Sequence, residues 1–289
     1  MAAPTCLPPQ APRAPRAPLP AGSCDTHIHV FGEAERFPLD PRRNYTPVAA
    51  TLDHYRAVMA ACNIARAVLV QPSVYGTDNR CLLEGLREGG AAFRGVAVVG
   101  PGTADAELEA MHALGVRGLR LNVVNPAVLG IGDALALAAR TERLGWHLQV
   151  HVDLRDASGF DLLESIAARC PVPLVVDHMG RADPGLPAPP VLLSLLAAGR
   201  TWVKLSAAYR LSRRGAPGYE DVLPLARSLA AANPERLLWA SDWPHSELFD
   251  KVPQDGELAD LVSDWLPDAA LRHRVCVENP ARLYGYPAA

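Results

Sequence analysis

Two hydrophobic periods alternate along this chain, and the alternation limits its fold more than any other feature. Eight short runs are almost continuous in Val, Leu and Ala, which is typical of strands buried on both faces. They span 23–30, 66–72, 94–100, 115–123, 147–152, 174–179, 202–207 and 236–244. Segments with a helical period lie between them, at about 52–62, 79–89, 104–114, 133–144, 158–169, 188–198, 218–232 and 256–264. This order predicts parallel βαβ units, and eight such units predict an α/β fold, a (β/α)8 TIM barrel.

A doubly wound open sheet is the alternative way to arrange parallel βαβ units. Such a sheet usually carries a glycine-rich phosphate loop directly after its first strand. No loop of that kind follows residues 23–30. We therefore expect a closed barrel, formed as a single domain by residues 22–289.

Residues 1–21 have a different composition from the rest of the chain. They contain seven prolines, in a pattern close to a repeat of Ala-Pro-Arg. Proline has no N–H for a sheet ladder and biases the preceding residue toward extended geometry. We expect an extended or disordered arm that is excluded from the core; a basic docking arm is the alternative.

Composition excludes several classes of function. The formal net charge is −3, which argues against a nucleic-acid partner or an anionic membrane surface. No apolar run approaches the roughly 20 residues of a membrane span, and the N-terminus lacks the apolar segment of a signal peptide. The six cysteines show no C-x-x-C spacing, so free thiols and a cytoplasmic location are expected. The sequence sets no oligomeric state.

Polar residues gather where the predicted strands end. In a (β/α)8 barrel the carboxyl ends of the strands share one mouth, where catalytic residues lie. The polar residues at these positions are His27, His29, Gln71, Ser73, Arg120, Asn122, His151, Asp153, Asp177, His178, Arg181, Ser206, Arg210, Ser241, Asp242 and His245. Because charged groups there cost stability unless they are solvated or paired, their concentration predicts a functional site.

His27 and His29 are the most specific pair in that set. Residues two apart in a strand point to the same face, so the two imidazoles emerge side by side. A structural pair would need both rings satisfied by backbone carbonyls. Asp242 ends an apolar run and, with histidine partners, is a candidate general base. His178 alone is a weak signal, and His151 either faces the mouth or packs.

Several motifs resemble the amidohydrolase superfamily, and in particular the branch that contains 2-pyrone-4,6-dicarboxylate lactonase and the sugar-acid lactonases. They are Asp25–Phe31 (DTHIHVF), Gln71–Asn79 (QPSVYGTDN), Arg117–Asn122 (RGLRLN), Asp177–Arg181 (DHMGR), Ser241–His245 (SDWPH) and Asn279–Gly285 (NPARLYG). The resemblance covers residues 23 to about 286.

The resemblance implies a barrel that hydrolyses a lactone and needs no metal. It implies that Asp242 is the general base and that His27, His29 and His178 polarise the carbonyl. It further implies that the small carboxylated substrate is held by Tyr45, Ser73, Arg120, Arg181 and Arg210, since a guanidinium group binds a carboxylate bidentately.

This chain departs from that branch at two positions. The second carboxylate-binding arginine, expected near Asn125-Pro126, is missing, and Glu247 stands where an asparagine is expected. Both departures place the pyrone dicarboxylate itself in question as the substrate.

A metal centre is the alternative within the enzyme class. His27, His29, His151, His178 and Asp242 offer up to five ligands, enough for a catalytic Zn²⁺ with an open position. The protein would then be a metal-dependent amidohydrolase or a decarboxylase of an aromatic or small organic acid. An acid-binding barrel without turnover is the alternative outside the enzyme class.

Overall fold

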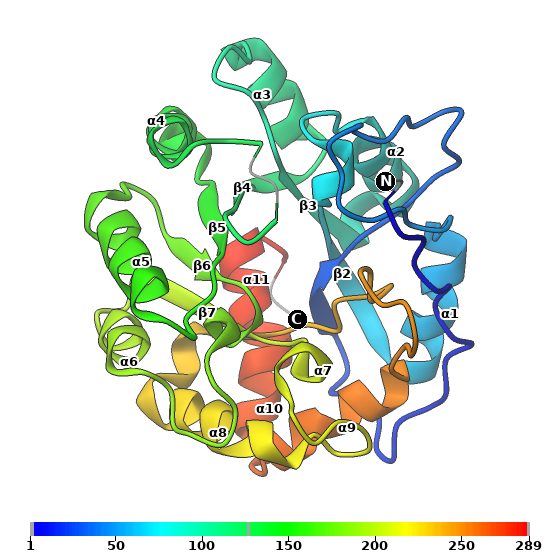
Figure 1. Cartoon of the computed structure of the whole chain (residues 1–289), viewed down its shortest axis with the longest axis vertical. Coiled ribbons are helices and arrows are strands. Elements are labelled where there is room, and N and C mark those ends of the chain that lie inside the picture. Colours follow the sequence, from blue (N-terminus) through cyan, green and yellow to red (C-terminus); the bar gives the residue numbers. More distant parts are fainter. Residues whose placement is uncertain (1–2, 126–127, 288–289) are drawn as a thin grey trace.

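Eight parallel strands form the centre of the protein, in the order β1 to β8 (Figure 1). The computed structural model describes residues 3–125 and 128–287. The strands are β1 (Ser23–Ile28), β2 (Ile64–Val70), β3 (Phe93–Ala97), β4 (Val116–Asn122), β5 (His147–His151), β6 (Leu174–Val176), β7 (Thr201–Leu205) and β8 (Leu237–Trp239). The ring closes where Ile28 pairs with Trp243 in parallel and the His29 N–H donates to the Trp243 carbonyl at 2.8 Å. The predicted (β/α)8 TIM barrel is confirmed.

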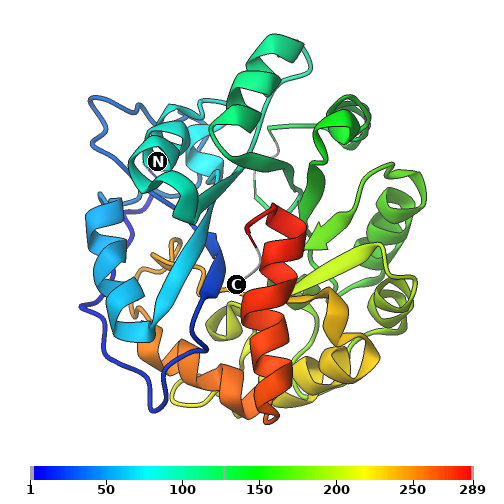
Figure 2. The same cartoon turned by 180° about the vertical axis from the view of Figure 1, so that it is seen from behind.

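Helices cover the outside of the barrel, one long helix after each strand. They are α1 (Leu52–Cys62), α2 (Arg80–Gly89), α3 (Asp105–Ala113), α4 (Ile131–Thr141), α5 (Ala157–Arg169), α6 (Pro190–Ala197), α8 (Leu223–Ala232) and α9 (Asp255–Trp265). Shorter helices are α7 (Ala208–Leu211), α10 (Ala269–His273) and α11 (Asn279–Tyr284). Figure 2 shows α11 lying across the end of the barrel that faces away from the viewer in Figure 1. In the described residues, no helix is both long and apolar enough to cross a bilayer.

The strands end earlier than their apolar runs indicate, and β6 and β8 show the reason. β6 ends at Val176 and β8 at Trp239, although the runs continue to residues 179 and 244. The backbone φ of His178 is 51° and that of Asp242 is 67°, in the left-handed region that strands do not use. The chain therefore leaves the sheet while it is still buried, and hydrophobicity alone cannot show where this happens.

Residues 3–21 form an arm of extended chain that runs down one side of the barrel (dark blue in Figure 1). Near its start, the Cys6 N–H donates to the Thr46 carbonyl at 2.8 Å and the Leu7 N–H donates to the Leu248 carbonyl at 2.9 Å. Cys6 and Leu19 are buried in the core. This corrects the expectation that the arm is excluded from the core, because apolar side chains between the prolines find contacts on the barrel.

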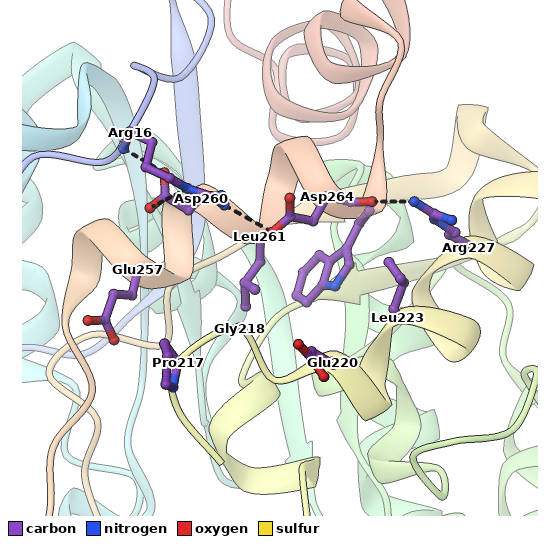
Figure 3. A pocket seen from close by; sticks show the side chains of 11 residues that line it. Arg16, Pro217, Gly218, Glu220, Leu223, Arg227, Glu257, Asp260, Leu261 and Asp264 are labelled. Atoms are coloured by element: carbon purple, nitrogen blue, oxygen red, sulfur yellow. Dashed lines mark hydrogen bonds and ion pairs between the residues drawn. The ribbon is translucent and has the colours of Figure 1, made fainter. Parts of the chain in front are cut away.

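The arm also borders a groove of about 580 Å³ against α8 and α9, which we call the arm groove (Figure 3). Arg16 of the arm forms ion pairs there with Asp260 at 3.2 Å and with Asp264 at 3.1 Å. Glu220 and Glu257 also line the arm groove, so carboxylates outnumber cations along this hollow.

Candidate active site

Four buried side chains meet at the carboxyl end of the barrel. His27 and His29 lie at the end of β1, while His178 and Asp242 follow β6 and β8. The Asp242 Oδ1 atom lies 3.8 Å from His27 Nε2, 3.8 Å from His29 Nε2 and 3.7 Å from His178 Nε2. These separations exceed a direct hydrogen bond, and they keep the carboxylate within one-water reach of all three rings. The four residues named from the sequence therefore share one site, which we call the mouth site.

The backbone around Asp242 fixes the direction of its carboxylate. The Asp242 N–H donates to the His27 carbonyl at 3.0 Å, and the Asp242 carbonyl accepts from the His245 N–H at 2.9 Å. A non-glycine residue at φ 67° carries strain that persists only where surrounding contacts hold it, and such residues cluster at functional sites. The turn after β8 is thus tied directly to β1.

The second carboxylate oxygen of Asp242 is held by two groups on α7. The Tyr209 hydroxyl donates to Oδ2 at 2.6 Å and the Arg210 Nε–H donates to it at 2.9 Å. Burial alone would raise the pKa of Asp242, but the nearby histidines and Arg210 outweigh it and hold the pKa well below its usual range. Asp242 is therefore an ionised carboxylate with one oxygen anchored and the other facing the rings. Sequence reasoning missed Tyr209, whose only signal is its place beside Arg210.

Hydrogen bonds at Nδ1 decide what His29 and His27 present to Asp242. His29 Nδ1 lies 2.7 Å from the Val70 carbonyl, which can only accept, so Nδ1 carries the proton. His27 Nδ1 lies 3.2 Å from Asp177 Oδ1, which can only accept, and 3.3 Å from the Lys204 ammonium group, which can only donate; a proton at Nδ1 satisfies the carboxylate, which is the closer of the two. Both neutral rings then turn an Nε2 lone pair toward Asp242. They can polarise a carbonyl only when protonated or through a bound cation.

His178 differs from the other two rings because its Nδ1 partner is a hydroxyl. Ser206 Oγ lies 2.9 Å from His178 Nδ1, and a hydroxyl can either donate or accept; when it donates to Nδ1, the ring proton lies on Nε2. Burial lowers the pKa of His178 to about 4 and that of His29 to about 3. At neutral pH both rings are uncharged, and His178 is the ring that can donate a hydrogen bond from Nε2.

A buried polar network inside the barrel contacts His27 on the Nδ1 side of its ring. The Lys204 ammonium group donates to the Gln149 side-chain oxygen at 2.7 Å and to the Thr26 carbonyl at 2.9 Å, and it lies 3.4 Å from Asp177. Burial acts to raise the pKa of Asp177, but His27 and Lys204 outweigh it and hold that pKa well below its usual range. Burial also lowers the pKa of Lys204 to about 8. Sequence reasoning missed this network, although a lysine within the apolar run of β7 was a usable signal.

The residues expected to contact substrate differ in their burial and in their partners within the protein. Tyr45 is buried, and burial raises the pKa of its phenol, so the hydroxyl stays protonated. Arg120 lies near the end of β4 and lines a small cavity together with Ser73 and Asn122. Its Nη1 group donates to the Gln71 carbonyl at 2.9 Å.

Arg181 and Arg210 are both paired with carboxylates of the protein. The Arg181 Nε–H donates to Asp153 Oδ2 at 3.1 Å. Arg210 holds Asp242, as described above, and lies 3.7 Å from Glu247. Pro126, beside which the expected arginine is missing, lies outside the described residues.

His151 and His245 have different surroundings. The His151 ring centroid lies 5.2 Å from that of His178, and neither of its nitrogens has a hydrogen-bond partner among residues 3–125 and 128–287. His151 is thus buried beside the mouth site. His245, by contrast, is bound through Nε2 to Asp255 of α9 at 3.0 Å, so it anchors the turn after β8.

The donor set at the mouth site fits a divalent cation. The ligand atoms of His27, His178 and Asp242 all lie within 4.8 Å of one another, and His29 faces the same aspartate oxygen. In the described part of the chain, His27 Nε2 is buried without a hydrogen-bond partner. Imidazole and carboxylate ligands of this kind suit Zn²⁺. His151 does not belong to this compact group.

Comparison with known proteins shows which family the chain belongs to. The amidohydrolase family model matches residues 24–286. The chain belongs to the amidohydrolase family. It is 37% identical to a 2-pyrone-4,6-dicarboxylate hydrolase of Comamonas testosteroni, over 94% of this chain and 93% of that protein. It is also 37% identical to a 4-sulfomuconolactone hydrolase of Rhizobium radiobacter, over 96% of this chain and 97% of that protein.

A solved structure shows the same fold as this amidohydrolase. A protein of Agrobacterium tumefaciens in its apo form superposes with a TM-score of 0.83 at 28% identity, over 96% of this chain and all of that one. The barrel is therefore shared along its whole length.

Proposed function

We propose that this amidohydrolase hydrolyses the ring ester of a small lactone that carries an acid group. The observation that carries the proposal is the buried, ionised Asp242, whose free oxygen faces three imidazoles within one-water reach. The relatives named above are hydrolases of lactones with acid groups, which supports the same reaction class. All six cysteines are free and buried, in keeping with a cytoplasmic enzyme.

The reaction needs a base, a stabiliser of negative charge and a proton for the leaving oxygen. Asp242 takes a proton from water, and the resulting hydroxide attacks the lactone carbonyl carbon. The His178 Nε2–H faces the oxygen on which negative charge develops; one such donor is typically worth about 10²–10³-fold in rate. When the ring C–O bond breaks, the proton held by Asp242 passes to the leaving oxygen, which gives a hydroxy acid.

The lone pairs of His27 and His29 orient the reacting water. A water beside Asp242 has two protons: one is directed to the Asp242 carboxylate and the other is donated to Nε2 of either His27 or His29, which leaves an oxygen lone pair directed at the carbonyl. Positioning of this kind removes much of the entropic barrier to attack.

The lone pairs also favour a second candidate, a metal-dependent hydrolase or decarboxylase that uses the same residues. His27, His29, His178 and Asp242 would hold the ion. Such an ion supplies Lewis-acid polarisation of a carbonyl and lowers the pKa of bound water. Our first proposal remains catalysis without a required metal, on the resemblance to the pyrone-dicarboxylate branch.

One experiment tests both candidates. The protein is purified without added metal, its metal content is measured, and a panel of acid lactones is assayed with and without chelator. We expect ring opening that survives the chelator and falls in Asp242→Asn. Full activity in Asp242→Asn would contradict the assigned base. Stoichiometric zinc or manganese, with activity lost on its removal, would instead establish the second candidate.

A further inference from the structure

The turn that carries Asp242 has an unusual backbone. Asp242, His245 and Glu247 have φ values of 67°, 63° and 63°, in the left-handed region that residues other than glycine rarely adopt. Such a conformation persists only where surrounding contacts hold it. The contacts of residues 242 and 245 with β1 and α9 hold the near end of the turn. The far end, residues 246–248, therefore needs contacts of its own.

The start of the arm supplies two of these contacts. The Leu7 N–H donates to the Leu248 carbonyl at 2.9 Å. The Glu247 N–H in turn donates to the Cys6 Sγ atom at 3.3 Å. Cys6 is 5% exposed, so this hydrogen bond is shielded from water. The arm thus holds both a donor and an acceptor of the turn, and we call Cys6 and Leu7 the arm clamp.

The arm clamp is itself fixed to the loop before α1. The Cys6 N–H donates to the Thr46 carbonyl at 2.8 Å, and the Thr46 N–H donates to the Pro4 carbonyl at 2.7 Å. The Thr46 hydroxyl also donates to the Ala3 carbonyl at 3.2 Å. Three hydrogen bonds to one residue hold the start of the arm in place, so the arm clamp can act as a support for the turn.

The far end of the turn is connected to Asp242 through Arg210. The Arg210 Nη2–H donates to the Ser246 carbonyl at 2.6 Å, and the Nε–H donates to Asp242 Oδ2 at 2.9 Å. Ser246 directly precedes Glu247, which the arm clamp holds. A displacement of residues 246–248 would therefore move the guanidinium group that anchors the carboxylate.

The later part of the arm has different partners. Arg13 pairs with Glu257 of α9 at 2.7 Å, and Arg16 pairs with Asp260 of the same helix at 3.2 Å (Figure 3). Both arginines are exposed, and exposed pairs of this kind contribute little. The connection to the mouth site thus belongs to the start of the arm and not to its arginines.

We propose that Cys6 and Leu7 are positioning residues of the active site, which hold the turn after β8 so that the free oxygen of Asp242 stays directed at the three imidazoles. They act through residues 246–248 and Arg210. This inference rests on the proposed lactone hydrolysis, in which Asp242 is the base.

Proline substitution tests the backbone donor of the arm clamp. Leu7→Pro removes the N–H that reaches Leu248. Ala11→Pro is the matched control, because Ala11 also precedes a proline and its N–H donates to no backbone carbonyl in the described residues. We expect Leu7→Pro to lower kcat on an acid lactone by about tenfold with KM changed little, since misplacing a catalytic group by about 1 Å costs up to about 10²-fold. Ala11→Pro should stay within about twofold of the parent.

A pair of small side chains tests the thiol of the arm clamp. Cys6→Ser keeps an acceptor for the Glu247 N–H, whereas Cys6→Ala removes it. We expect kcat to fall by about tenfold in Cys6→Ala and to be largely retained in Cys6→Ser. A role limited to stability would give the opposite order, because alanine suits a buried position better than serine.

Hydrogen–deuterium exchange of residues 243–250 gives a readout that needs no substrate. The Glu247 amide should exchange about tenfold faster in Leu7→Pro and in Cys6→Ala, and at the parent rate in Ala11→Pro. Circular dichroism shows whether each variant is folded under the assay conditions. If Leu7→Pro does not fold, the two Cys6 variants decide the inference.

Two results would overturn the inference and leave the lactone hydrolase proposal intact. The first is exchange of residues 243–250 at the parent rate in both Leu7→Pro and Cys6→Ala. The second is faster exchange with an unchanged kcat. A parent protein that opens no acid lactone would instead refute the proposed function and the catalytic role of the arm clamp together, whatever the exchange shows about the hold on the turn.

Discussion

The mouth site and the arm groove are two hollows of one molecule, and they differ in how their charged groups are paired and exposed to solvent. In the arm groove, Arg16 is 69% exposed and pairs with Asp260 and Asp264 in solvent. In the mouth site, Asp242 and its three histidines are buried, and Asp242 Oδ1 makes no direct hydrogen bond to any of the three rings. The arm groove is large, yet its polar groups are satisfied. A functional site is therefore recognised by buried polar atoms that lack a partner within the protein, and not by the volume of the hollow.

The largest expected difference between the two hollows is in turnover. Asp242→Asn removes the base while it keeps the shape of the side chain, so kcat should fall by about 10²–10⁴-fold. Asp260→Asn makes the same chemical change in the arm groove and should leave kcat within about twofold of the parent, because surface substitutions perturb little. Steady-state kinetics on an acid lactone measure both, and circular dichroism confirms that both fold. An equal loss of kcat in Asp242→Asn and Asp260→Asn would contradict the assignment of catalysis to the mouth site.

His178→Asn should give the next largest effect. The shorter amide keeps a hydrogen-bonding group at the Nδ1 position near Ser206 but places no donor at the Nε2 position, so kcat is expected to fall by about 10²–10³-fold with KM changed little. The exposed His273→Asn provides the matched control at 46% side-chain exposure. A change confined to KM would show that His178 binds substrate rather than stabilising charge.

The pH dependence of stability should also come from the mouth site. Burial lowers the pKa of His29 to about 3 and of His178 to about 4, whereas the unfolded rings titrate near 6.5. The unfolded chain therefore binds more protons below pH 6.5, and the free energy of unfolding falls as the pH drops from 6.5 toward 4. Each such ring contributes about 1.4 kcal/mol per pH unit.

Urea unfolding at pH 7 and pH 5 checks this slope. The slope should be shallower in His178→Asn by about the contribution of one ring. An identical slope in parent and variant would mean that His178 is already charged in the folded protein.

The smallest effect is expected in the arm groove. Arg16→Gln breaks two exposed ion pairs, and such pairs are worth about 0–1 kcal/mol each. The unfolding free energy should fall by no more than that, less so in high salt, with kcat unchanged. A loss of several kcal/mol would show that the arm groove is held as tightly as the mouth site.

Local pattern in the sequence predicted the barrel and the set of polar residues at the ends of its strands, and the resemblance to the amidohydrolases selected the four central residues among them. Continuous apolar runs indicate buried parallel strands, and the carboxyl ends of such strands meet, so His27, His29, His178 and Asp242 could be brought together without coordinates.

What the sequence could not show depends on contacts between distant segments. It did not show that Tyr209 anchors Asp242 or that Lys204 and Asp177 support His27, because these contacts join residues on different strands and loops, and the directions of their side chains are set only in the folded barrel. Nor could it show which of the arginines are already engaged. The sequence also did not show the early ends of β6 and β8, because the turns that follow these strands are as buried as the strands themselves.

The barrel closes between its first and last strands, where the His29 N–H reaches the Trp243 carbonyl and the Asp242 N–H reaches the His27 carbonyl. His27 and His29 lie on the β1 side of this contact, and Asp242 lies on the β8 side. Until this contact between the first and last strands has formed, the imidazoles and the carboxylate are not held together, and no catalysis is expected. The return of catalysis during refolding therefore reports that the contact between β1 and the turn after β8 has formed, which spectroscopic probes of helix content do not report.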